Sequence, residues 1–150
     1  MKIAIFFHVV GVVVWVGGMF FAYMALRPAA AVLDPPQRLP LWQETLRRFF
    51  NWVWVSIAFV LASGLSMLFL IGGFGAAPVH VHAMFAIGIV MMGIFGHVFF
   101  APFRRLTSAV AAKNWKEGGA ALGQIRRLVA VNLTLGLVTI AIATVGAIFV

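Results

Sequence analysis

The residues of this sequence best suited to chemistry are its four histidines, and the first, His8, lies inside a long apolar run at about residues 3–26. An imidazole within a bilayer is costly unless it faces a partner or a ligand, so His8 marks a candidate functional site. On a helical wheel it shares one face with Gly11, Trp15 and Gly18, which would supply an aromatic wall and two gaps. The alternative is that the glycines form a packing seam and that the imidazole bonds to a backbone carbonyl.

The other three histidines lie together in a later apolar run, at about residues 79–103. His80, His82 and Met84 open this run, and His97 lies near its far end. His82 shares a helix face with His97, whereas His80 points the opposite way, so we expect His82 to face inward. His97 lies about 22 Å along the helix from His82 and cannot bind the same metal, which leaves it as a candidate ligand of a second cofactor.

Four apolar runs are each long enough to cross about 30 Å of hydrocarbon. Hydrophobic residues make up 64% of the 150 residues and charged residues 9%, a balance that a soluble domain of this size would not tolerate. We therefore predict an all-α integral membrane protein with one domain, a four-transmembrane-helix bundle with spans at about 3–26, 50–72, 79–103 and 129–150. The absence of cysteine excludes disulfides, iron–sulfur clusters and cysteine-bound zinc.

The basic residues are concentrated in two of the three predicted connections between spans. Four lie in the first and six in the third (residues 104–127), so these two hold ten of the eleven, whereas the connection at 72–78 has no charge. The positive-inside rule then places both basic connections in the cytoplasm and both termini in the periplasm of a bacterial inner membrane. Because the cations flank membrane spans, nucleic acid is not an expected partner.

The connections have local features of their own. We predict that the first is a long loop in which Pro35, Pro36 and Pro40 fix turns, followed by a helical lead-in to the second span. The short glycine-rich connection at 72–78 makes spans 2 and 3 antiparallel neighbours. The third connection is predicted to be an amphipathic helix in the membrane interface, anchored by Trp115.

The two halves of the chain repeat one order of residues. Each half has a histidine, an arginine at the inner end of the span, a basic connection, an Arg-Arg pair and an asparagine, at His8, Arg27, Arg47, Arg48 and Asn51 and at His82, Arg104, Arg126, Arg127 and Asn132. Such a repeat predicts two hairpins related by a pseudo-two-fold axis along the membrane normal. His8 and His82 would then lie at similar depth, where two imidazoles could hold a b-type haem through both axial positions.

Several segments resemble known families. The segment FHVVGVVVWVGGMFF resembles the opening helix of the bacterial copper resistance D (CopD) family. More distantly, LRRFFNWVWVSIAFVLASGL, PVHVHAMFAIGIVMMGIFGHVFFAPFRRL and IRRLVAVNLTLGLVTIAIA resemble spans 2 to 4 of the haem-containing bacterial protoporphyrinogen oxidase family. The resemblances imply a four- or five-helix membrane protein with a span-1 histidine near haem or copper. The oxidase family has Asn-Glu-x-Pro where this chain has Asn132, Leu133 and Thr134, so porphyrinogen oxidation is not expected.

Three functions fit these observations. The first is a haem-b protein that exchanges electrons with a membrane-soluble partner such as a quinone, as a haem-dependent membrane oxidoreductase would. The second is a copper-handling protein with an outer site made of His8, His80, His82 and Met84, because imidazole and thioether groups suit copper. The third is a structural or accessory subunit without a cofactor. Lipid is a partner in every case, and the glycine faces could serve a homodimer.

Overall fold

The computed structural model describes residues 1–146, which form four long helical rods joined by short connections. As predicted, the protein is all-helical, no strand occurs within residues 1–146, and each rod is long and apolar enough to cross a membrane. The predicted positions 147–150 of the last span lie outside the described residues. The elements are α1 (Lys2–Phe21), η1 (Ala22–Leu26), α2 (Arg27–Ala30), α3 (Pro35–Leu70), η2 (Phe74–Ala76), α4 (Val79–Phe100), α5 (Pro102–Ala111) and α6 (Trp115–Val145).

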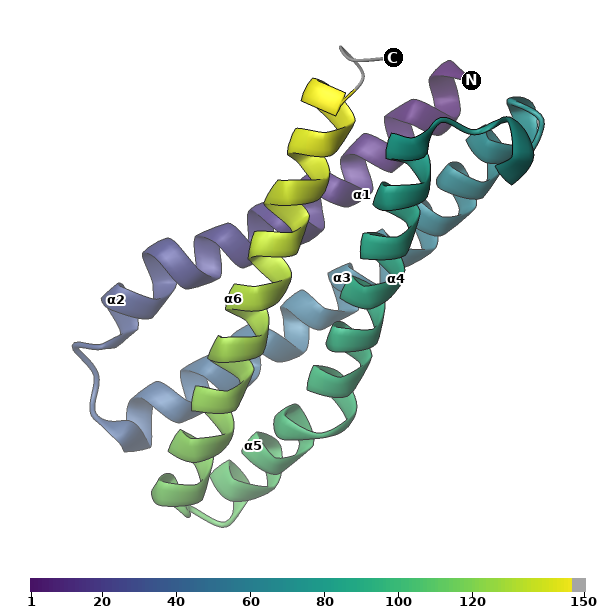
Figure 1. Cartoon of the computed structure of the whole chain (residues 1–150). Coiled ribbons are helices and arrows are strands. Elements are labelled where there is room, and N and C mark those ends of the chain that lie inside the picture. Colours follow the sequence, from purple (N-terminus) through teal and green to yellow (C-terminus); the bar gives the residue numbers. More distant parts are fainter. Residues whose placement is uncertain (147–150) are drawn as a thin grey trace.

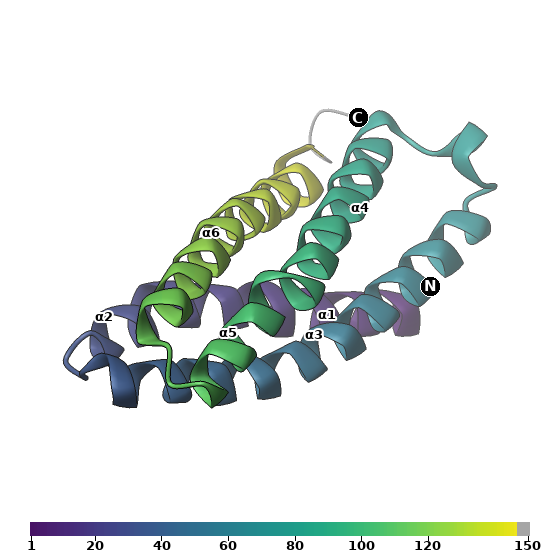
Figure 2. The same ribbon diagram turned by 90° about the horizontal axis from the view of Figure 1, so that it is seen from below.

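The rods form two antiparallel hairpins that lie against each other as two layers (Figure 1). α1 packs along α3 in one layer, and α4 and α5 pack along α6 in the other. Seen from below, the two layers cross at an angle (Figure 2). The start of α1, residues 71–78 and the end of α6 lie at one end of the bundle, here called the terminal end. The connections at residues 31–34 and 112–114 lie at the opposite end, here called the basic end.

The first rod of each hairpin is irregular close to a proline. Because Pro28 has no N–H, the regular hydrogen-bond ladder cannot continue through it, and the Arg27 N–H bonds to the carbonyl of Ala22 in a π turn. In the second hairpin, Ala101 leaves helical geometry with φ −117° and ψ −86°, and α5 begins at Pro102. The irregularities fall at corresponding places in the two halves of the predicted repeat, near the basic end.

The first connection is much shorter than predicted, because only residues 31–34 lie between α2 and α3. Pro35 and Pro36 are the first residues of α3, where a missing N–H costs nothing since these groups have no partner within the helix. Pro40 also lies inside α3. The prediction that these prolines fix turns was therefore wrong. With 36 residues, α3 is about 54 Å long and extends well beyond a bilayer core at the basic end.

The third connection, predicted to be one amphipathic helix anchored by Trp115, forms the amphipathic helix α5 and the first turns of α6. Residues 112–114 form a tight turn in which Lys113 has a φ of 54°. Asn114 caps α6, since its side-chain oxygen accepts the Glu117 N–H at 3.2 Å and its amide donates to the Glu117 carboxylate at 3.0 Å. The amphipathic pattern buries Leu106, Ala109 and Leu122 between α5 and α6. The pattern therefore reflects packing within a helical hairpin.

An aromatic cluster joins the two hairpins in the middle of the bundle and toward the basic end. Phe50 of α3 is 2% exposed and makes edge-to-face contacts with Phe95 and Phe103, with ring centroids 5.3 and 5.0 Å apart. Trp15 of α1, in the same hairpin as Phe50, also packs edge-to-face on Phe95, with ring centroids 6.3 Å apart. Such contacts bring van der Waals packing and favourable ring geometry, which hold helices together in lipid.

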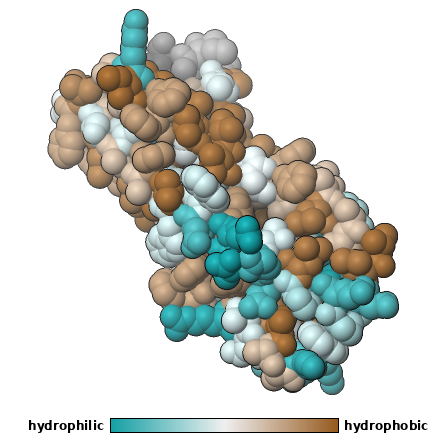
Figure 3. All heavy atoms as spheres, turned by 180° about the vertical axis from the view of Figure 1, so that it is seen from behind, coloured by the Kyte–Doolittle hydropathy of each residue, from teal (hydrophilic) through white to brown (hydrophobic). Residues whose placement is uncertain are grey.

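The surface is apolar over the terminal half of the molecule. Seen from behind, hydrophobic residues cover this half and hydrophilic residues gather on the other (Figure 3). Large apolar side chains such as Phe6, Phe69 and Val79 are 61%, 75% and 85% exposed. Exposed apolar surface on helices of this length is what contact with lipid requires, so this is a multi-pass membrane protein.

Candidate functional site

The two hairpins separate toward the terminal end and enclose a cavity of about 660 Å³. All four rods contribute to its walls, with Trp15 on α1, Met67 on α3, Met84 on α4 and Thr139 on α6. The lining is nearly all apolar. Within residues 1–146, His8 is the only lining residue with an ionisable side chain. The cavity is therefore a membrane-embedded pocket with one ionisable side chain, His8, in its described wall.

The His8 imidazole is held by α3. Its Nδ1 lies 3.1 Å from the hydroxyl oxygen of Ser63, and that hydroxyl donates its own hydrogen to the Phe59 carbonyl. With the serine hydrogen directed at that carbonyl, the serine oxygen can accept from an Nδ1–H, and in this tautomer the Nε2 lone pair is free. Gly64 lies beside the ring, since a Cβ there would be in van der Waals contact with the imidazole at 3.4 Å. Histidine ligands to metals typically have such a hydrogen bond from the ring nitrogen that does not bind the metal, and it orients the imidazole.

Methionines surround the same cavity, a feature that the sequence analysis missed. Five of the seven methionines line it, namely Met1, Met67, Met84, Met91 and Met92. Only Met84 was predicted as a ligand, because the others are dispersed between the start of the chain, α3 and α4 and form no local motif. One signal was present, since Met84 and Met91 are two helical turns apart and so share a face of α4. The cavity thus combines one imidazole with several thioethers.

The two glycines predicted to make room for a cofactor lie elsewhere, in the contact between α1 and α3. A Cβ on Gly11 would lie 3.0 Å from the Ser56 carbonyl oxygen, and one on Gly18 would overlap the ring of Phe49. Helix α3 therefore fills the space beside both glycines, as in a packing seam. Trp15, the third residue predicted on this face, is 4% exposed and does line the cavity.

His80 and His82, at the start of α4, face opposite ways. The one that the protein covers is His80, whereas the prediction was His82. His82 is exposed, its Nδ1 lies 3.1 Å from the Pro78 carbonyl oxygen, and its ring packs on Phe74. His80 is half-buried against α6, where a Cβ on Gly146 would lie 3.5 Å from its own Cβ. The expectation that His82 faces inward was wrong. The wheel gave the angle between the two side chains, whereas the position of α6 decided which one is covered.

The structure does not bring the predicted ligands together. His8 lines the cavity, but His82 and His80 do not. His97 is exposed at the other end of α4. Within residues 1–146 there is no group of three or more histidine, cysteine or acidic side chains able to hold a metal ion. Of the predicted site residues, only His8, Trp15 and Met84 share the cavity.

The cavity ends at the centre of the bundle, where Trp15, Met91 and Gly136 line it. Beyond them lies the aromatic cluster around Phe50 and Phe95. There Asn132 of α6 is 3% exposed, and its amide donates to the Met91 carbonyl at 3.2 Å. The cavity lining does not extend past this level, so the basic end is closed off from it.

These features define a class: a multi-pass helical membrane protein with an apolar cavity between two hairpins and a single histidine in its wall. The family model for copper resistance protein D matches residues 43–146, and the chain belongs to this family. The match supports the first of the two resemblances noted in the sequence and not the second. Residue His8 and the whole of α1 precede the matched residues. No curated protein and no solved structure matches the chain.

Proposed function

We propose that this protein handles copper in the membrane and that its cavity binds Cu(I) as cargo, through His8 and the surrounding methionines. The observation that carries this proposal is the placement of His8 and five of the seven methionines around one cavity. Membership of the copper resistance protein D family supports copper as the cargo. Haem, a quinone and a second copy of the chain, which the sequence also suggested, have no comparable support.

The chemistry of the lining favours a soft monovalent metal. Thioether and imidazole groups suit Cu(I), whereas no lining side chain within residues 1–146 supplies the carboxylate or carbonyl oxygens preferred by magnesium or calcium. Methionine also fills irregular gaps in apolar cores. Met67, Met84 and Met92 are only half-buried and border open space, so filling gaps does not account for their positions.

The position of the cavity suggests from which side copper reaches it. The cavity lies in the terminal half, and the aromatic cluster separates it from the basic end. By the positive-inside rule, the arginines in the helices near this end favour a cytoplasmic basic end. On this orientation, in a bacterial inner membrane, copper would reach His8 from the periplasmic half of the membrane.

Competition for Cu(I) tests the proposal. The purified protein, kept reduced with ascorbate, is titrated against a coloured Cu(I) chelator. We expect His8→Ala and the volume-conserving Met84→Leu each to weaken the Cu(I) Kd about tenfold or more, which corresponds to about 1.4 kcal/mol. The matched control is His97→Ala, which removes an exposed imidazole outside the cavity and should leave the Kd unchanged.

Other results would point to the other functions. Unchanged Cu(I) affinity in both cavity variants would overturn the proposed site. A Soret band in the purified protein that His8→Ala abolishes would favour the haem-b function instead. Binding of neither copper nor haem would favour a structural or accessory subunit without a cofactor.

A further inference from the structure

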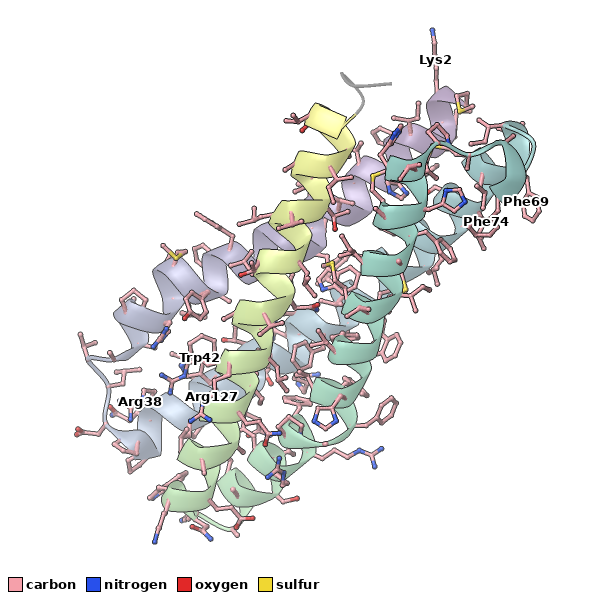
Figure 4. The ribbon with its side chains drawn as sticks, in the orientation of Figure 1. Lys2, Arg38, Trp42, Phe69, Phe74 and Arg127 are labelled. Atoms are coloured by element: carbon pink, nitrogen blue, oxygen red, sulfur yellow. The ribbon has the colours of Figure 1, made fainter. Side chains whose placement is uncertain are left out.

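Three arginine side chains from three different elements lie together at the basic end. They are Arg27 at the start of α2, Arg38 near the start of α3, and Arg126 in α6. Helix α6 contacts η1, which ends directly before Arg27, and the positive charges of Arg27 and Arg38 act on the guanidinium of Arg126. Figure 4 labels Arg38 and the neighbouring Arg127 at this end, opposite Lys2 and Phe69. Like charges brought together repel one another, so a cluster of this kind favours a counter-charge.

No carboxylate within residues 1–146 supplies that counter-charge. The ion pairs of the described chain are those of Glu44 with Arg47 and Arg48, on a different part of α3. Glu117 bonds to Asn114 at the turn before α6. Asp34, the third acidic residue, lies directly before α3 and forms no ion pair within residues 1–146. The three arginines are therefore not paired with a carboxylate among the described residues.

Some guanidinium N–H groups of the cluster also lack a hydrogen-bond acceptor among the described residues. The Nε of Arg126 is buried and has no hydrogen-bond partner among the described residues. Arg38 uses one guanidinium nitrogen to donate to the Leu33 carbonyl at 3.2 Å, and Arg27 stacks over the ring of Tyr23 at 4.9 Å. A buried donor without an acceptor is unfavourable, and the planar guanidinium fork matches the oxygens of a phosphate.

The cluster lies at the depth of the lipid headgroups. The apolar run of the first rod ends at Leu26, directly before Arg27. Tyr23 belongs to the same end, and aromatic residues with a polar edge are typical of the membrane interface. Basic pockets between helices at this depth bind anionic lipid headgroups.

We propose that Arg27, Arg38 and Arg126 form a binding site for the phosphate of an anionic phospholipid headgroup, at the place where α2, α3 and α6 meet. A bound headgroup brings one negative charge among the three cations, lowers the repulsion between them, and joins the first hairpin to the second. This site lies at the end of the bundle opposite the cavity and does not depend on the copper proposal.

Thermal unfolding of the full-length protein in a neutral detergent tests the site. Phosphatidylglycerol is added as the anionic lipid, phosphatidylcholine at the same mole fraction as the zwitterionic lipid, and inorganic phosphate as the free anion. We expect phosphatidylglycerol to raise Tm by about 5 °C and the other two to have much smaller effects. Arg126→Gln should abolish the rise. Arg38→Gln should reduce it, and this second variant serves as the test if Arg126→Gln folds poorly.

The matched control is Arg104→Gln. Arg104 is also an exposed cation near the basic end, but it stacks over Phe100 outside the cluster. Its variant should keep the full response to phosphatidylglycerol. An equal rise with phosphatidylcholine, a rise that inorganic phosphate reproduces, or a response that survives both Arg126→Gln and Arg38→Gln would overturn the lipid site.

Discussion

The two ends of the bundle are built from the same four rods but differ in how the two hairpins meet. Toward the basic end, Phe50 of the first hairpin lies among Phe95 and Phe103 of the second, and little space is left between the layers. Toward the terminal end, the hairpins separate around a cavity of about 660 Å³ that contains His8. Within each hairpin the paired helices remain in contact along most of their length.

The two ends of the bundle therefore have different roles: the aromatic packing at the basic end stabilises the fold, and the cavity at the terminal end can bind a ligand. Aromatic packing at the closed end can hold the hairpins together, so that the open end need not fill its interior with side chains. The imidazole of His8 is nevertheless held rigidly, because Ser63 belongs to the helix that packs on α1 along the whole hairpin. A binding residue supported by a rigid scaffold beside open space is a common arrangement for a ligand site.

The sharpest test of the comparison asks which end faces the cytoplasm, and its outcome is all or none. The chain has no cysteine, so single cysteines report their own position. Ala76→Cys lies at the terminal end and Lys113→Cys at the basic end. We expect a membrane-impermeant thiol reagent to label position 76 in intact cells and to leave position 113 unlabelled, because the arginine-rich end should stay inside. The reverse pattern would contradict access of copper from the periplasm.

A large loss of stability is expected when the closed end loses its central ring. Phe50→Ala removes a side chain that is 2% exposed and leaves a void among three other rings, so the free energy of unfolding should fall by about 3 kcal/mol. Denaturant or thermal unfolding in detergent measures it. Phe69→Ala, at the terminal end and 75% exposed, is the control and should change stability little. Equal effects of the two substitutions would show that the core is not concentrated where the structure places it.

A smaller effect is expected within the first hairpin, where two nearby glycines differ only in their surroundings. Gly11→Ala places a methyl group 3.0 Å from the Ser56 carbonyl oxygen and should destabilise the α1–α3 contact by about 1–3 kcal/mol. Gly17→Ala meets nothing within 4 Å and should be neutral or stabilising by less than about 1 kcal/mol. The same unfolding measurement compares them. If Gly11→Ala were as mild as Gly17→Ala, the hairpin would be looser than the structure shows.

Several features were predictable from the sequence because they depend on local composition. The four apolar runs predicted the four membrane-crossing rods, and the charge distribution predicted one basic end. The short uncharged connection at 72–78 predicted that spans 2 and 3 are antiparallel neighbours. Helices α3 and α4 do run antiparallel, but they lie in different layers, where α3 packs along α1 and α4 packs along α6. The prolines misled the prediction because Pro35 and Pro36 are compatible with the first turn of a helix as well as with a loop.

What the sequence determined by itself is which segments enter the membrane and which residue types they carry, since burial of apolar helices in lipid follows from composition and length. It singled out His8 correctly as a residue that needs a partner. Only the tertiary structure decided that this partner is Ser63, that Gly11 and Gly18 are filled by α3, and that α6 covers His80 while His82 stays exposed. Only the tertiary structure shows, too, that methionines from separate helices line one cavity. A helical wheel gives the angles between side chains on one helix, but which side faces a neighbour depends on packing between helices far apart in the chain.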